Sequence, residues 1–141
     1  MLRRTSIAAV SAAIIGLCAA PAFASPVAKH ANSGNFNVPA ASSQVKGWGS
    51  YHRINAHRVH VQVCAKRSAG GSEFVVVEAI AYNGNYSKHS AIAAPLGPQT
   101  PGASSGVCAQ MNLLYTAHLK VFSFIGNGGK ITKKSSMKTI Y

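Results

Sequence analysis

Alternation of apolar and polar side chains over residues 107–125 constrains this fold more than any other feature of the sequence. The apolar residues share one parity and the polar residues share the other, with Leu114 as the exception: Met111, Leu113, Tyr115, Ala117, Leu119 and Val121 against Gln110, Asn112, Thr116, His118 and Lys120. Side chains point to opposite faces of a strand in turn, so the pattern predicts one long half-buried strand, or two strands that meet at a bend.

Further strands are predicted on both sides of this stretch. Within residues 54–65, Val59, Val61 and Val63 alternate with polar residues, and residues 73–83 are apolar on both parities, which is typical of a central strand. Because only a short Gly-Ser turn separates the two, we expect an antiparallel hairpin. The glycine-rich residues 126–129 predict a turn into a basic edge strand over residues 131–141.

Helical periodicity is missing throughout, so the fold class predicted is all-β. We expect a single small antiparallel β-sandwich or partly closed barrel of about five to seven strands, with one disulfide. Its predicted extent is residues 47–141. Residues 25–46, rich in Ala, Ser, Asn and Pro, are expected to form a loosely ordered N-terminal arm, although Phe36 and Val38 could form a short edge strand.

The first 24 residues have the pattern of a secretory signal peptide. Two arginines precede an uncharged apolar run, and Ala22-Phe23-Ala24 supplies a small-x-small cleavage site. The run is too short for a membrane anchor, so no transmembrane segment is expected after cleavage. We predict a secreted protein, extracellular or associated with the cell surface, exported by the general route or, given Arg3-Arg4, by the twin-arginine route.

Two cysteines remain once residues 1–24 are removed, and an exported chain meets oxidising conditions. Cys64 and Cys108 are therefore predicted to form a disulfide. Both fall on the polar parity of their strands, so the two strand ends should be neighbours.

Charge is the most one-sided property of the composition. Removal of residues 1–24 from the 141-residue chain leaves twelve Lys or Arg against Glu73 and Glu78, a net charge of +10 with neutral histidines. Such a charge attracts anionic polymers, among them cell-wall polymers and nucleic acid, or else it only keeps a secreted domain soluble. We therefore expect a non-enzymatic binding or envelope-associated protein that attaches electrostatically to an anionic polymer.

The binding candidates in the sequence are Arg58, His60, His118, Lys120 and Tyr86. They lie on polar strand faces or at a strand end, and would form one cationic surface if their strands were adjacent. Trp48, between two glycines, is expected to plug one end of the core. A secreted inhibitor or toxin that acts on a protein partner through residues 86–106 is an alternative.

A small secreted nuclease-like hydrolase is the enzymatic alternative. Glu78 would act as general base, with His60 or His118 as general acid and Arg58 at the phosphate. Pairing of Glu78 with Arg58 or Lys120 across strands is the simpler interpretation. No metal site is predicted, because His57 and His60 are three residues apart and point to opposite faces of a strand. No cofactor motif is present either: the chain has no glycine-rich phosphate loop.

Overall fold

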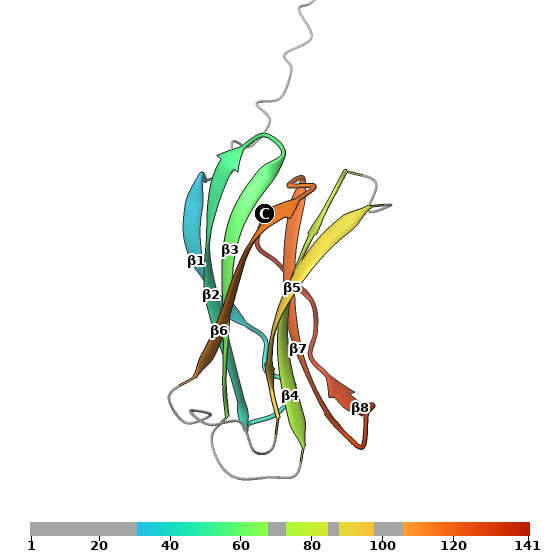
Figure 1. The fold of residues 1–141 in the computed structure, drawn as a ribbon. Coiled ribbons are helices and arrows are strands. Elements are labelled where there is room, and N and C mark those ends of the chain that lie inside the picture. Colours follow the sequence, from blue (N-terminus) through green and yellow to red (C-terminus); the bar gives the residue numbers. More distant parts are fainter. Residues whose placement is uncertain (1–30, 68–72, 85–87, 98–105) are drawn as a thin grey trace, which may run out of the picture.

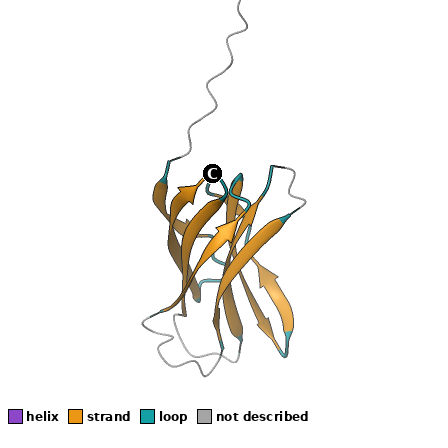
Figure 2. Ribbon diagram, turned by 45° about the horizontal axis from the view of Figure 1, so that its top comes forward, coloured by secondary structure: helices purple, strands orange, loops and turns teal. Residues whose placement is uncertain are grey.

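Two antiparallel sheets packed face to face make up the computed structural model, which describes residues 31–67, 73–84, 88–97 and 106–141. One sheet has four strands in the order β1-β2-β3-β6, and the other has five, with the order β5-β4-β7-β8 and β9 also paired to β7. The strands are β1 Ser33–Val38, β2 Val45–Asn55, β3 Arg58–Arg67, β4 Phe74–Tyr82, β5 His89–Leu96, β6 Val107–Leu114, β7 His118–Asn127, β8 Lys130–Lys134 and β9 Lys138–Thr139. Figure 1 shows the two layers, and Figure 2 shows strands and loops with no helix in the described residues.

The core of the sandwich is formed by the side chains that point inward from the two sheets. Every second residue of β3 and β4 is buried, and the inward side chains are small or β-branched, so the two sheets can pack closely. The fully buried positions include Val59, Val61, Val63, Val77, Leu113, Leu119 and Val121. This confirms an all-β sandwich, and the nine described strands exceed the five to seven expected.

The residues 107–125 that dominate the sequence pattern form two strands and not one. β6 ends at Leu114 in the four-stranded sheet, and β7 begins at His118 in the five-stranded sheet. Tyr115 takes a left-handed backbone conformation with φ of 63° between them, and this turn carries the chain across the sandwich. The bend alternative is therefore confirmed.

The predicted hairpin between residues 54–65 and 73–83 is wrong. β3 pairs with β2 and β6, and β4 pairs with β5 and β7, so the two strands lie in opposite sheets. A short connection is also compatible with a crossing between layers, which strand periodicity does not distinguish from a hairpin. β4 does lie in the interior of its sheet, as its apolar character on both parities predicted.

The first strand and the last strands of the described chain each fall in a segment for which the sequence made a prediction. β1, within the arm expected to be loosely ordered, pairs along its whole length with β2 and buries Phe36 and Val38. At the other end, β7 and β8 form the predicted hairpin, whose Gly128 and Gly129 have positive φ. The lysines of β8 are exposed on the edge, as expected. Residues 1–30, with the predicted signal peptide, lie outside the described residues.

Two polar contacts join the sheets beside the core. Ser123, fully buried in β7, accepts a hydrogen bond from the backbone N–H of Ala41 and donates to the carbonyl of Pro39, which holds the β1–β2 connection against the other sheet. On the opposite side, the Ser90 hydroxyl of β5 accepts from the backbone N–H of Leu114 and donates to its carbonyl. These bonds pair backbone groups of the β1–β2 connection and of the last residue of β6 with serine hydroxyls of the other sheet.

Candidate binding site

The outer face of the four-stranded sheet carries aligned rows of polar side chains. Antiparallel register places residues of β1, β2, β3 and β6 directly opposite one another, and their outward side chains form rows across the sheet. One row is Asn37, Trp48, Cys64 and Cys108, and the next is Asn35, Ser50, Gln62 and Gln110. Apart from Trp48 and the cystine, these two rows consist of amides and a hydroxyl.

The predicted disulfide anchors the first row. Cys64 of β3 and Cys108 of β6 are paired in register and bonded, with their α-carbons 4.0 Å apart. The bond lies on the outer face, outside the main core, although Cys64 itself is buried under its neighbours. It therefore fixes the edge strand β6 beside β3, next to Trp48.

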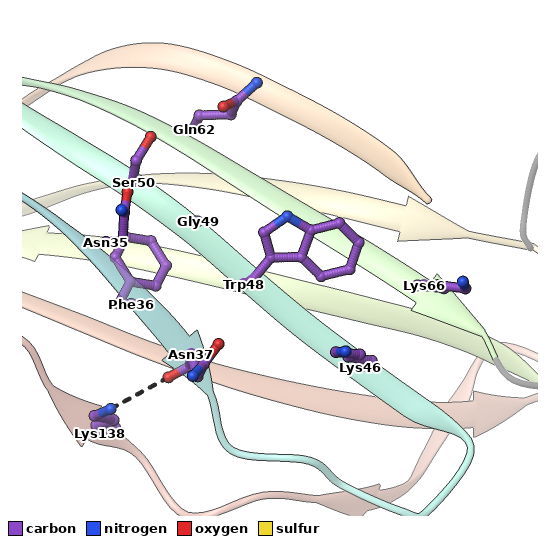
Figure 3. A pocket seen from close by; sticks show the side chains of 10 residues that line it. All are labelled: Asn35, Phe36, Asn37, Lys46, Trp48, Gly49, Ser50, Gln62, Lys66 and Lys138. Atoms are coloured by element: carbon purple, nitrogen blue, oxygen red, sulfur yellow. Dashed lines mark hydrogen bonds between the residues drawn. The ribbon is translucent and has the colours of Figure 1, made fainter. Parts of the chain in front are cut away.

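An open pocket of about 830 Å³ lies on this face and extends to the edge of the other sheet. Its volume falls within the range of ligand-binding clefts. We call it the Trp48 pocket, and Figure 3 shows the residues that line it: Asn35, Phe36, Asn37, Lys46, Trp48, Gly49, Ser50, Gln62, Lys66 and Lys138. All but Lys138 come from β1, β2 and β3.

Trp48 presents the face of its indole ring in this pocket. Its position in β2 has outward parity, between the buried positions of Gly47 and Gly49. Gly106, with φ of +100°, lies against the edge of the ring, since a β-carbon there would be 2.8 Å from Cη2 of Trp48. Only glycine combines this backbone conformation with such a close approach. Gly106 thus packs closely against the Cη2 and Cζ2 atoms of the ring, and Figure 3 shows the ring among the side chains that line the pocket.

Positive charge is concentrated around Trp48. Lys46 of β2 and Lys66 of β3 are directly opposite in the antiparallel register. On the other side of the pocket, Lys138 of β9 donates from Nζ to the carbonyl of Asn37 at 3.4 Å. Neither of the two glutamates of the chain lines the pocket. Opposed like charges destabilise a sheet by a few tenths of a kcal/mol, and here no neighbouring carboxylate offsets that cost.

Polar groups continue along the same face beyond the pocket. His60 of β3 is paired in register with His52 and with Asn112, and its Nδ1 lies 2.9 Å from Oδ1 of Asn112. Arg58, at the start of β3, is exposed on the same parity. From Lys66 to Arg58 the face extends about 26 Å at 3.3 Å per residue. Two of the predicted binding residues, Arg58 and His60, therefore share a face with the Trp48 pocket.

The other predicted binding residues do not join them. His118 and Lys120 lie on β7, on the outer face of the five-stranded sheet, with Lys120 Nζ 5.9 Å from the ring centroid of Tyr82. The single mixed surface expected from sequence is therefore divided between the two opposite faces of the sandwich. Tyr86 lies outside the described residues, as do parts of the 86–106 segment, of which residues 89–96 form β5.

The groups proposed for a hydrolase are also separated. Glu78 is on the outer face of the five-stranded sheet, whereas His60 is on the outer face of the four-stranded sheet, with the core between them. His118 shares a face with Glu78. The register partner of Glu78 on β7 is Phe122, however, and His118 lies four residues from Phe122, about 13 Å along the strand. Burial raises the pKa of the Glu78 carboxyl, and Lys134 and then His89 oppose this increase. No acid–base pair within hydrogen-bond reach is formed by these three residues.

Sequence reasoning placed Trp48 in the core and did not select Lys46, Lys66 or Lys138. The signal was present for Lys46, since Lys46, Trp48 and Ser50 alternate with buried positions in β2. It was not recognised because glycines occupy the inward positions at 47 and 49, where apolar side chains would have marked the strand. The position of Lys138 depends on the approach of β9 to β1, which is a tertiary contact.

The described residues contain neither a group of three His, Cys, Asp or Glu side chains placed to hold a metal ion, nor a helix long and apolar enough to cross a membrane. A second, smaller pocket of about 340 Å³ lies at the β2–β3 and β6–β7 turns, where Leu114 and Tyr115 are exposed.

Together these features define the class of the protein: an antiparallel β-sandwich stapled by one disulfide, with an open, lysine-rimmed aromatic pocket on the outer face of one sheet. No protein-family model matches the chain, and comparison with curated proteins and with solved structures finds no match.

Proposed function

We propose that this protein is a non-enzymatic binding protein that acts outside the cell and attaches to an anionic polymer through the Trp48 pocket. The observation that carries the proposal is the opposition of Lys46 and Lys66 beside Trp48, with Lys138 across the pocket. An anionic ligand would relieve the repulsion between the two ammonium groups. Binding would therefore remove an electrostatic cost that the free protein carries at this position.

The remaining face supports extended attachment. Arg58 and His60 lie about 20 to 26 Å from Lys66 along β3, so a polymer that occupies the pocket can also reach them. The predicted export and the disulfide agree with a site outside the cell, where such polymers are exposed. Binding of this kind needs no reacting group, which agrees with the separation of Glu78 from His60 and His118.

Affinity for long-chain polyphosphate, measured over a series of salt concentrations, tests the proposal. Binding should weaken linearly on logarithmic axes as salt increases, because each phosphate contact releases bound counterions. In the double variant Lys46→Gln/Lys66→Gln, affinity at low salt should fall on the order of tenfold and the slope should become shallower by about 1.4.

The matched control is Lys130→Gln/Lys133→Gln, which removes the same charge from exposed positions of β8 outside the pocket. It should change the affinity and the slope much less. Equal effects of the two double variants would show that net charge alone attracts the polymer, and would contradict a site at Trp48.

A further inference from the structure

We propose that the polymer bound in the Trp48 pocket is an acidic polysaccharide, with a sugar ring stacked on the indole, hydroxyls bonded to the amides and acid groups at the lysines. The inference rests on the proposed function, because it assumes that an anionic polymer binds here. It adds the chemical class of that polymer.

The indole supplies a flat apolar platform. Trp48 is the only Phe, Tyr or Trp at an outward position among the described strands of the four-stranded sheet. The face of an aromatic ring is electron-rich, and the C–H groups of a pyranose ring carry partial positive charge, so the two surfaces attract each other as well as excluding water. Gly106 approaches the indole closely at Cη2, and a side chain at this position would compete with a ligand for space beside the ring.

The amides around the indole match hydroxyl groups. Asn35, Asn37 and Gln62 line the pocket beside the hydroxyl of Ser50. A carboxamide offers both donors and acceptors, and so can bond to a sugar hydroxyl in either sense. A bare phosphate chain would accept hydrogen bonds only, and the amide oxygens would remain without ligand donors.

The same face is less suited to single-stranded nucleic acid. Proteins that bind single strands stack successive bases on several aromatic side chains along a cationic groove. Here the two rows that follow Trp48 along the face contain Ser50, amides and histidines, with Gln110 and Asn112 of β6 at their ends. A chain of hydroxylated rings uses this arrangement more completely than a chain of bases.

Lysines on two sides of the indole place the acid groups. Lys46 is two residues from Trp48 on the same face of β2, about 7 Å along the strand, with Lys66 opposite it. Lys138 lies on the β1 side, beside Asn37. A ring stacked on Trp48 would thus have ammonium groups near its neighbours in the polymer, and carboxylate, sulfate or phosphate substituents there would be recognised.

Fluorescence of Trp48 reports on the site directly, because the chain has one tryptophan. Four probes separate the contributions: polygalacturonate, which has rings and charge; dextran, rings alone; polyphosphate, charge alone; and polydeoxythymidylate. Polygalacturonate should change the emission saturably and bind more than tenfold more tightly than dextran. In Trp48→Leu, the affinity for polygalacturonate, measured by calorimetry, should fall on the order of tenfold, and the affinity for polyphosphate should fall much less. Trp48→Phe, which keeps a ring, should lose less, and thermal unfolding of each variant reports on its fold.

Each outcome has one meaning. Equal affinities of polygalacturonate and polyphosphate, with no loss in Trp48→Leu, would overturn the polysaccharide inference and leave the proposed function intact. Tighter, Trp48-dependent binding of polydeoxythymidylate would overturn it in favour of nucleic acid. Absence of binding to all three anionic polymers at low salt would overturn the proposed function as well.

Discussion

The two outer faces of this sandwich are built from the same alternating strands but carry different chemistry. On the four-stranded sheet, the outward side chains around Trp48 are amides, hydroxyls and lysines, and they surround an open pocket. On the five-stranded sheet, the outward positions of β4 and β7 are mainly aromatic or aliphatic: Phe74, Val76, Ile80, Tyr82, Phe122 and Phe124. The rings of Phe74 and Phe122 both pack against that of Phe124.

The lysines show what this difference means. Lys134 Nζ lies 4.1 Å from the ring centroid of Phe122, and Lys120 Nζ lies 5.9 Å from that of Tyr82, so these cations cover aromatic rings of their own chain. Lys46 instead lies opposite Lys66 and gains no such contact from its register partner. Lysines therefore contact aromatic rings on one face, whereas on the other face two of them are directly opposite each other. Total charge does not reveal this division.

Removal of the disulfide should produce the largest change in stability, and it acts on the pocket face. Cys64→Ala/Cys108→Ala opens a loop with a sequence separation of 44 residues. The chain-entropy model gives a loss of about 4 kcal/mol, and measured losses are commonly 2–4 kcal/mol. Denaturant unfolding of the oxidised protein and the variant measures it. A loss below about 0.5 kcal/mol would mean that β6 is held to β3 without the covalent link.

Single lysine substitutions on the two faces should change the free energy of unfolding in opposite directions. Lys46→Gln removes the repulsion with Lys66 and should raise the free energy of unfolding by about 0.5 kcal/mol. Lys134→Gln removes the cation from the Phe122 ring and should lower it by about 0.5–1 kcal/mol. Denaturant unfolding of both variants at low salt is the measurement, and the same sign for both would contradict the contrast between the faces.

The smallest effect concerns Glu78, the one carboxylate among the apolar side chains of β4. Since burial raises its pKa in the folded state, the native protein retains a proton that the unfolded chain releases. Stability contributed by this group should therefore fall as pH rises from the ordinary glutamate pKa of about 4.3 through the raised value. In Glu78→Gln this component disappears, and the variant should be at least as stable as the wild type at pH 7. Unfolding curves collected from pH 4 to pH 8 would reveal a fall in the variant too if another group were responsible.

Much of the fold could be predicted because strand alternation is a local property. The inward valines of β3, the interior position of β4, the turn at Gly128-Gly129 and the Cys64–Cys108 bond all follow from the pattern and from the cysteine count. The sheet to which each strand belongs does not follow from the pattern. Whether a connection makes a hairpin or crosses between layers depends on packing, and this produced the error for β3 and β4.

The candidate site was less predictable for the same reason. Arg58 and His60 could be assigned to a polar face, but whether Lys120 shares that face depends on strand order, and β7 lies in the other sheet. Trp48 lies on a strand whose inward neighbours are glycines, so its sequence lacks the apolar alternation that would have identified its outward direction. The lysine of β9 enters the pocket only through the approach of two sheet edges.

Mapping of the contact surface by NMR tests the central claim most directly. Titration of isotope-labelled protein with short polyphosphate should shift the Trp48 indole N–H and the backbone amides of residues 46–50 and 62–66, which form the pocket face. Signals from residues 74–82, on the other sheet, should change little. Shifts that cluster on residues 74–82 or along residues 130–134 would contradict an anion-binding site at Trp48.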